Sequence, residues 1–204
     1  MFITFEGLDF SGKTTQATLL VRRLASDGRV VHFLREPGGT PISERIRDLL
    51  LDGRYPEMGD VTELLLFSAG RSQLVREVIG PALARGEDVV CDRYADSTTA
   101  YQGYGRGLDS AAVRAVNALA TGGIRPDLTI FVDIPVEEIA PRKAAAGQPF
   151  DRMESSGREF YERVRAGYAA LVREEPGRIR RVDGMHAVEE VHERIMAILA
   201  GIPA

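Results

Sequence analysis

Residues Gly7 to Thr14 carry the spacing of a loop that binds phosphate groups. They read Gly-Leu-Asp-Phe-Ser-Gly-Lys-Thr and match the pattern G-x-x-x-x-G-K-[ST]. The loop follows strand-like residues 2–6 and opens onto a helical pattern at Lys13, which is the context that the pattern requires. A glycine turn at the start of a helix would account for Gly7 and Gly12, but it would give the Lys-Thr pair no role.

The groups of this loop complement the negative charge of a triphosphate. Glycines let backbone N–H groups turn toward the phosphates, and the N-terminus of the following helix adds a partial positive charge. The Lys13 ammonium would bridge the β- and γ-phosphates, and the Thr14 hydroxyl would hold Mg²⁺. The sequence therefore predicts a nucleoside triphosphate in contact with Gly7, Leu8, Asp9, Phe10, Ser11, Gly12, Lys13, Thr14 and Thr15.

A second polar group, Asp92-Arg93-Tyr94, follows an apolar run. An arginine at the carboxyl end of a strand could clamp a phosphate of the acceptor, while Asp92 orders Mg²⁺ or its waters. By itself, the tripeptide is more typical of an ion pair that caps a strand. Phosphoryl transfer needs positioning and charge neutralisation more than covalent chemistry, so the open question is which molecule accepts the phosphate.

Short apolar runs that alternate with longer helical patterns must position these groups. This alternation predicts an α/β fold, a three-layer sandwich with a five-stranded parallel sheet and helices on both faces. We expect strands at 2–6, 29–34, 88–92, 128–133 and 178–182. We expect helices at 13–26, 42–51, 62–84, 110–120, 136–144, 157–174 and 187–200. Ligands of such folds bind at the carboxyl ends of the strands.

Composition limits the other possibilities. The chain of 204 residues is 44% apolar, has no repeat or linker, and is expected to form a single domain over 1–204. Its net charge of −4 offers no basic field for nucleic acid or an anionic membrane. Cys91 is the only cysteine, and its apolar setting favours packing over reactivity. No basic N-terminal segment or membrane-length apolar run is present, which favours a cytoplasmic protein.

The segment 142–153 interrupts the last part of the helical pattern with glycine and proline. Arg142, Lys143 and Arg152 lie in it, which favours a lid that closes over phosphates. An ordinary surface loop with solvated charges fits its position equally well.

Several segments together resemble the bacterial thymidylate kinases, over nearly the whole length and in the family's order. They are Phe5–Asp9, Gly12–Gln16, Arg35–Gly39, Phe67–Arg71, Asp92–Tyr94, Tyr101–Gly103 and Asp151–Glu154. The resemblance implies a P-loop NTPase fold and transfer of the γ-phosphate of ATP to dTMP with Mg²⁺, giving dTDP and ADP. It also implies a homodimer packed through long helices, for which the helix 62–84 is a candidate.

The resemblance assigns acceptor contacts that the residues alone leave open. Phe67 would stack on the thymine ring, and Arg71, at i+4, would donate to the base's carbonyl oxygens. Without the family, core packing is the simpler explanation of Phe67. The remaining implied dTMP contacts are Asp9 at the sugar or at Mg²⁺ water, Arg35 and Arg93 at the phosphate, Thr98 and Gln102 near the base, and Tyr101 against the position of a ribose 2′-hydroxyl. Residues Glu36 to Gly39 would belong to the same pocket.

Phe10 departs from those family members that carry an arginine in the phosphate loop. Positive charge on the migrating phosphoryl group would then come from the lid, as the bacterial type implies. The implied catalytic residues are Lys13, Asp9, Arg93, Arg152 and Arg142, with Thr14 and Asp92 at the metal.

Two other functions fit parts of the sequence. Another nucleoside or nucleoside monophosphate kinase would share the fold and chemistry and differ only in its acceptor. A nucleotide-dependent switch without kinase activity would leave the acceptor-side arginines without a role, and the guanine-reading Asn-Lys-x-Asp segment of a GTPase is absent.

Overall fold

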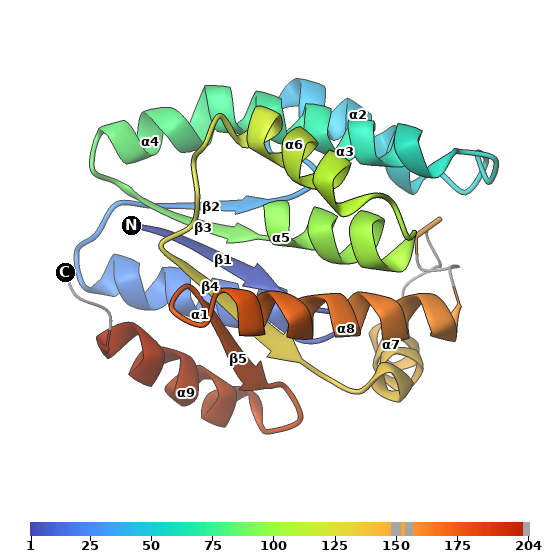
Figure 1. Ribbon diagram of the computed structural model, residues 1–204. Coiled ribbons are helices and arrows are strands. Elements are labelled where there is room, and N and C mark those ends of the chain that lie inside the picture. The colour runs from blue at the N-terminus through green and yellow to red at the C-terminus, as the bar shows by residue number, and fades with distance from the viewer. Residues whose placement is uncertain (148–151, 154–156, 202–204) are drawn as a thin grey trace.

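Five parallel strands form the centre of the protein. A computed structural model describes residues 1–147, 152–153 and 157–201. The strands are β1 (Phe2–Glu6), β2 (Val31–Arg35), β3 (Asp88–Asp92), β4 (Leu128–Asp133) and β5 (Ile179–Asp183), in the spatial order β2-β3-β1-β4-β5 (Figure 1). Every pair is parallel, so all five carboxyl ends lie at one edge of the sheet. The predicted five-stranded parallel sheet is confirmed.

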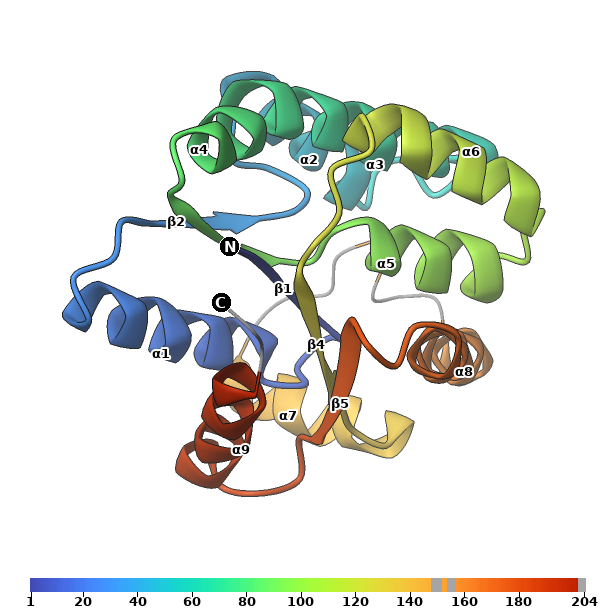
Figure 2. The same cartoon turned by 60° about the vertical axis from the view of Figure 1, so that its left-hand side comes forward.

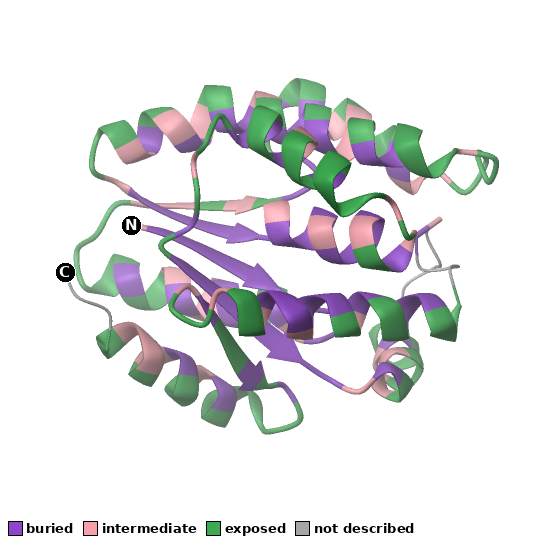
Figure 3. Cartoon of the chain, in the orientation of Figure 1, coloured by how far each residue is buried: buried purple, intermediate pink, exposed green. Residues whose placement is uncertain are grey.

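Helices cover both faces of the sheet. They are α1 (Lys13–Ser26), α2 (Pro41–Leu51), α3 (Asp60–Leu74), α4 (Gly80–Ala84), α5 (Ala95–Thr98), α6 (Ser110–Thr121), α7 (Ile139–Ala146), α8 (Arg158–Glu174) and α9 (Val188–Ala200). The helices α1 and α9 pack on one face, and α5 and α8 lie on the other (Figure 2). β1, β3 and β4 are buried at every residue, which explains their unbroken apolar runs, whereas the edge strands β2 and β5 are partly exposed (Figure 3).

The predicted helix 62–84 is one continuous rod with an irregular centre. It consists of α3, a π-helical turn at Val75–Ile79, and α4. Pro81 cannot donate a backbone hydrogen bond, and the wider turn before it accommodates that loss within the rod. The side chains of Leu74 and Ile79 are fully buried against β1 and β3, so the rod is fixed on the sheet by apolar packing.

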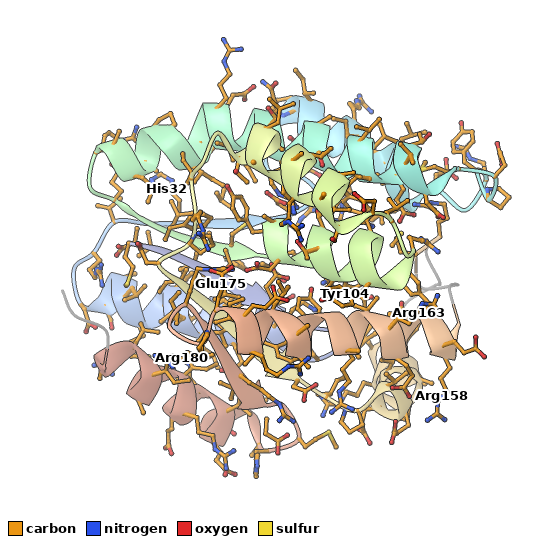
Figure 4. All side chains as sticks on the ribbon, viewed as in Figure 1. His32, Tyr104, Arg158, Arg163, Glu175 and Arg180 are labelled. Carbon is orange, nitrogen blue, oxygen red and sulfur yellow. The ribbon has the colours of Figure 1, made fainter. Side chains whose placement is uncertain are left out.

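A helical segment after β3 was not expected from the sequence. It comprises α5 and a π-helical turn at Thr99–Gly105. Its threonines and two glycines are poor helix formers, so local propensity does not explain the helix. Contacts with α8 do, because Arg163 of α8 donates to the Gly105 carbonyl oxygen at 2.8 and 3.0 Å, and the Tyr104 ring lies over Gly167 (Figure 4).

Close approach of these two helices depends on Gly105. A Cβ atom there would lie 2.6 Å from the Phe160 ring and 2.8 Å from Val164, which are two buried side chains of α8. We expect Gly105→Ala to lower the free energy of unfolding by about 1–3 kcal/mol through overpacking. Denaturant titration of the purified protein measures this change.

Gly103 is the matched control, since it lies in the same π-helical turn. A Cβ there would meet only Val113, at 3.9 Å. Gly103→Ala should change stability by less than about 1 kcal/mol, with the better helix propensity of alanine acting in its favour. Equal losses in both variants would show that the helix–helix approach is not the cause.

Candidate active site

The phosphate loop connects β1 to α1 in a conformation that only glycine permits at its first position. Gly7 has φ of 142°, and a Cβ atom there would lie 2.4 Å from the carbonyl oxygen of Val132. Gly12, with φ of 95°, precedes the first turn of α1. That turn carries no acidic side chain, so its N–H groups keep their positive potential for an anion.

Lys13 is held inside the loop rather than in solvent. Its side chain is buried, and Nζ donates to the Leu8 carbonyl oxygen at 2.7 Å. Burial lowers the pKa of Lys13 to about 8, and the positive charge of Arg93 acts in the same direction. Asp92, Asp9 and Glu6 oppose this shift without cancelling it.

Arg93 joins the phosphate loop to the acceptor side. Its backbone has φ of 74°, unusual for a residue with a side chain, and its guanidinium donates to the Gly7 carbonyl oxygen at 2.9 Å and pairs with Asp9. The Tyr101 hydroxyl lies 3.1 Å from both side chains. Burial alone would raise the pKa of Asp9, but the charges of Arg93 and Lys13 outweigh it and hold the pKa below its usual value.

Thr14 and Asp92 meet where a metal would be expected. The Thr14 hydroxyl donates to the Asp92 carboxylate across the crevice between α1 and β3. Both supply oxygen atoms, which Mg²⁺ prefers, and Mg²⁺ commonly takes only one or two protein ligands beside phosphate oxygens and waters. The pair therefore fits this ion, although the described residues contain no cluster of three or more acidic, histidine or cysteine side chains.

A pocket that is partly open to solvent lies next to Arg93. Seven residues expected at the acceptor line it: Asp9, Phe67, Arg71, Arg93, Thr98, Tyr101 and Gln102. Glu36 and Pro37 line it too, as the resemblance implied. Phe67 is only partly buried and belongs to the wall of the pocket as well as to the adjoining apolar cluster. Phe67 therefore lies where it could contact a ligand, and it also takes part in core packing.

Sequence reasoning missed four residues of this pocket: Arg47, Leu51, Ser97 and Met153. Arg47 lies four residues after the buried Ser43 and so on the inner face of α2, but the burial of the polar Ser43 is evident only from the fold. An arginine on the inner face of an amphipathic helix points to a charged ligand or partner. Ser97 and Met153 carry no comparable pattern.

Two residues that were predicted to contact the acceptor have protein partners in this structure. Arg71 is buried, and its guanidinium donates to Glu36 at 2.8 Å, to Thr98 at 2.9 Å and to the Tyr94 carbonyl oxygen at 2.9 Å. A bond to a base carbonyl would have to replace one of these partners. Arg35 does not line the pocket. It is exposed and pairs with Glu44 at 3.0 Å, while Arg47 reaches the pocket from α2.

The two arginines predicted to act from the lid lie in different parts of the site. Arg152 is mostly buried and pairs with Glu63 at 2.7 Å, on the acceptor side, beside Met153 of the pocket wall. Arg142 approaches the phosphate loop, where its guanidinium lies 3.5 Å from the Phe10 carbonyl oxygen. Residues 148–151, also part of the expected lid, lie outside the described residues.

Phe10 has a structural partner that the sequence did not indicate. Its backbone has φ of 61°, and the Lys143 ammonium lies 5.8 Å from the centre of its ring, within the range of a cation–π contact. Arg142 and Lys143 of α7 thus both contact Phe10, one at its backbone and one at its ring. Phe10 connects α7 to the phosphate loop.

Comparison with known proteins identifies the family. A model described as thymidylate kinase matches residues 5–195. The chain belongs to the thymidylate kinase family. Curated thymidylate kinases of Chlorobaculum parvum and Chlorobium luteolum are 48% and 49% identical, over 99% and 98% of this chain and 96% of each relative. A solved thymidylate kinase of Ehrlichia chaffeensis has a TM-score of 0.78 and 35% identity over 98% of both chains. This thymidylate kinase family member has no helix, among its described residues, that could span a membrane.

The lowered pKa of Lys13 predicts how triphosphate binding depends on pH. The protonated ammonium attracts phosphate, so its contribution to affinity should be fully present about one pH unit below 8 and should fall as the pH rises through 8. At pH 8.5, phosphate binding should restore the ammonium and take up a fraction of a proton. Titration calorimetry with ATP in buffers of different ionisation enthalpy measures this uptake. Lys13→Met should abolish it, and an unchanged uptake in that variant would assign the proton to another group.

Proposed function

We propose that the chain transfers the γ-phosphoryl group of ATP to dTMP, giving ADP and dTDP. The observation that supports this most directly is the sharing of Arg93 and Asp9 by two sites. Arg93 bonds the phosphate loop through Gly7 and also lines the acceptor pocket with Asp9. A donor on the loop and an acceptor in the pocket would therefore meet at this ion pair. Membership of the thymidylate kinase family favours dTMP as the acceptor.

On the donor side, residues 7–15 would surround the triphosphate, with Lys13 at its β- and γ-phosphates. The backbone N–H groups at the start of α1 and the Lys13 ammonium bear the positive charge. Mg²⁺ would be held by Thr14 and Asp92, directly or through water, and would neutralise charge on the phosphate oxygens. The bond to the Leu8 carbonyl oxygen uses one of the three N–H donors of Lys13, so the others would remain for phosphate oxygens.

On the acceptor side, Arg93 would hold the phosphate of dTMP, with Arg47 and Arg35 as further basic groups. Phe67 offers an aromatic face to the base, and Arg71, Thr98 and Gln102 line the wall beside it. Tyr101 is fixed by Asp9 and Arg93, so its ring would present a rigid wall to a ribose 2′-hydroxyl. Rigid walls exclude a larger competitor more effectively than mobile ones.

The chemical step needs no protein base. An oxygen of the dTMP phosphate, ionised at neutral pH, attacks the γ-phosphorus while the bond to the β-phosphate oxygen breaks and ADP leaves. The chain contributes charge and alignment, with Lys13 and Arg93 at opposite ends of the transferred group. Arg142 and Arg152 are proposed as the lid charges, and the approach of Arg142 to Phe10 supports its place near the loop.

A coupled assay of ADP formation with different acceptors tests the function. We expect dTMP to be used at least about 100-fold more efficiently, in kcat/KM, than AMP, CMP or GMP, because a polar pocket built for one base leaves its groups unpaired with another. Similar efficiencies would support another nucleoside monophosphate kinase. Tight GTP binding without transfer to any of these acceptors would support the switch.

Arg93→Ala tests the acceptor assignment in the same assay. It should lower kcat/KM for dTMP by about 100-fold or more, the effect of losing a charge-assisted contact in the transition state. Among the lid residues, Arg152→Ala should lower kcat more than it raises the KM of dTMP. Unchanged kinetics of Arg93→Ala would remove this residue from the site.

A homodimer is part of the proposal. Large apolar side chains are exposed on three neighbouring helices, with Ile42 on α2, Val61 and Leu65 on α3, and Leu119 on α6. Exposed apolar patches commonly mark interaction surfaces, and α3 begins the predicted helix 62–84. Light scattering should give twice the chain mass of 22.3 kDa, and Leu65→Arg should shift the protein toward one chain mass. A single chain mass for the unmodified protein would contradict the dimer.

A further inference from the structure

Glu6 is a buried carboxyl that the proposed chemistry does not use. It ends β1 directly before the phosphate loop and has no exposed surface. A carboxylate buried to this extent is costly unless several donors satisfy it. Glu6 directly precedes Gly7, so this unfavourable burial of a charge occurs at the candidate active site.

Three hydrogen bonds satisfy Glu6, and all three come from residues that hold Arg93. The backbone N–H of Tyr94, next to Arg93, donates to Oε1 at 2.8 Å. The hydroxyls of Ser97 and Tyr168 donate to Oε2 at 2.5 and 2.9 Å. The same two hydroxyls accept from Nη1 of Arg93, at 3.1 and 3.4 Å.

These bonds act on the backbone and on the side chain of Arg93 at once. The left-handed conformation at Arg93 is unfavourable for a residue with a side chain, and the bond from the following N–H to Glu6 stabilises it. Each hydroxyl that donates its proton to Glu6 turns its lone pairs toward the guanidinium. A neutral Glu6 would accept these bonds more weakly, and one hydroxyl could then donate to the other, which lies 2.9 Å away, so that neither would be held as firmly toward Arg93.

We propose that Glu6 is the positioning residue for Arg93, orienting the acceptor clamp through Tyr94, Ser97 and Tyr168. The inference rests on the proposed function only in taking Arg93 as the clamp of the dTMP phosphate. Glu6 does not line the acceptor pocket, so it acts through these three residues rather than on the substrate.

The surroundings of Glu6 make this role dependent on pH. Burial, together with the negative charge of Asp96, raises the pKa of Glu6 to about 7, against the lowering effects of Ser97, Arg93 and Tyr168. Glu6 also interacts electrostatically with Lys13 of α1, Arg71 of α3, the thiol of Cys91 on β3 and the phenol of Tyr168 on α8. Glu6 is therefore mostly neutral at pH 6 and mostly ionised at pH 8.5, and Arg93 is better oriented at the higher pH.

Glu6→Gln tests the inference, because it keeps the shape of the side chain and removes its ionisation. We expect kcat/KM for dTMP to be similar to that of the unmodified protein at pH 6 and about tenfold lower at pH 8.5, the effect of roughly one hydrogen bond. Taking the ratio of the two proteins at each pH cancels the ionisation of the substrate phosphates. A ratio that does not change with pH would overturn the proposal, and so would improved use of dTMP by the variant at high pH, which would show simple charge repulsion.

The Arg93→Ala background shows whether Glu6 acts through Arg93. There, adding Glu6→Gln should change kcat/KM by less than twofold, because the residue being positioned is gone. A full tenfold effect in this background would overturn the assignment. If the unmodified protein did not phosphorylate dTMP at all, the proposed function would fail instead, and the two failures are thus distinct.

Tyr168→Phe keeps the test available if Glu6→Gln does not fold. The Tyr168 ring stacks on Phe131 with centres 4.9 Å apart, and phenylalanine preserves that contact while removing one hydroxyl between Glu6 and Arg93. We expect a loss of about threefold in kcat/KM at pH 8.5. Tyr104→Phe, on the same helical interface but outside this network, is the matched control and should match the unmodified protein. Equal effects of both substitutions would overturn the proposal.

Discussion

The ion pair between Asp9 and Arg93 is the interaction on which the site depends. Asp9 comes from the loop after β1, and Arg93 comes from the turn after β3, the neighbouring strand. Both side chains are only partly exposed, so removing either charge would leave the other without its partner at a cost in free energy. The pair therefore fixes the distance between the phosphate loop and the acceptor pocket. The parallel sheet makes it possible, because it brings the two carboxyl ends to one edge.

Other buried polar residues surround the ion pair. Arg93 needs acceptors on its far side, and Ser97 and Tyr168 supply them while Glu6 satisfies both hydroxyls. Arg71 and Glu36 form a second buried pair in the pocket wall, and burial raises the pKa of Glu36 although Arg71 lowers it. Buried charges near a ligand site are held by such networks, which fix geometry more than they add stability.

Much of the fold and of the donor site could be predicted from the sequence, because both depend on local patterns. The periodicity of apolar residues predicted the strands and helices, and the spacing from Gly7 to Thr14 predicted the phosphate loop. Contacts between distant segments could not be predicted in this way. Tertiary packing on α8 stabilises the helix at 95–105 against its weak propensity. The cited partners of Arg71 and Arg152 come from three separate parts of the chain, at residues 36, 63 and 94–98. Side-chain type gives the chemistry of an arginine, but only the fold decides which acceptor it meets.

Phe10 shows how a single position connects the phosphate loop to α7. A glycine would adopt its left-handed conformation without strain, so retaining a phenylalanine there requires a compensating contact. Lys143 over the ring and Arg142 at the carbonyl oxygen supply contacts from α7, the helix that leads into the expected lid. A loop arginine would place a charge directly at the phosphates, whereas this arrangement places an aromatic surface there and leaves the charges on α7. Arg142 and Lys143 both contact Phe10. A movement of the phosphate loop on nucleotide binding would therefore alter the contacts of α7.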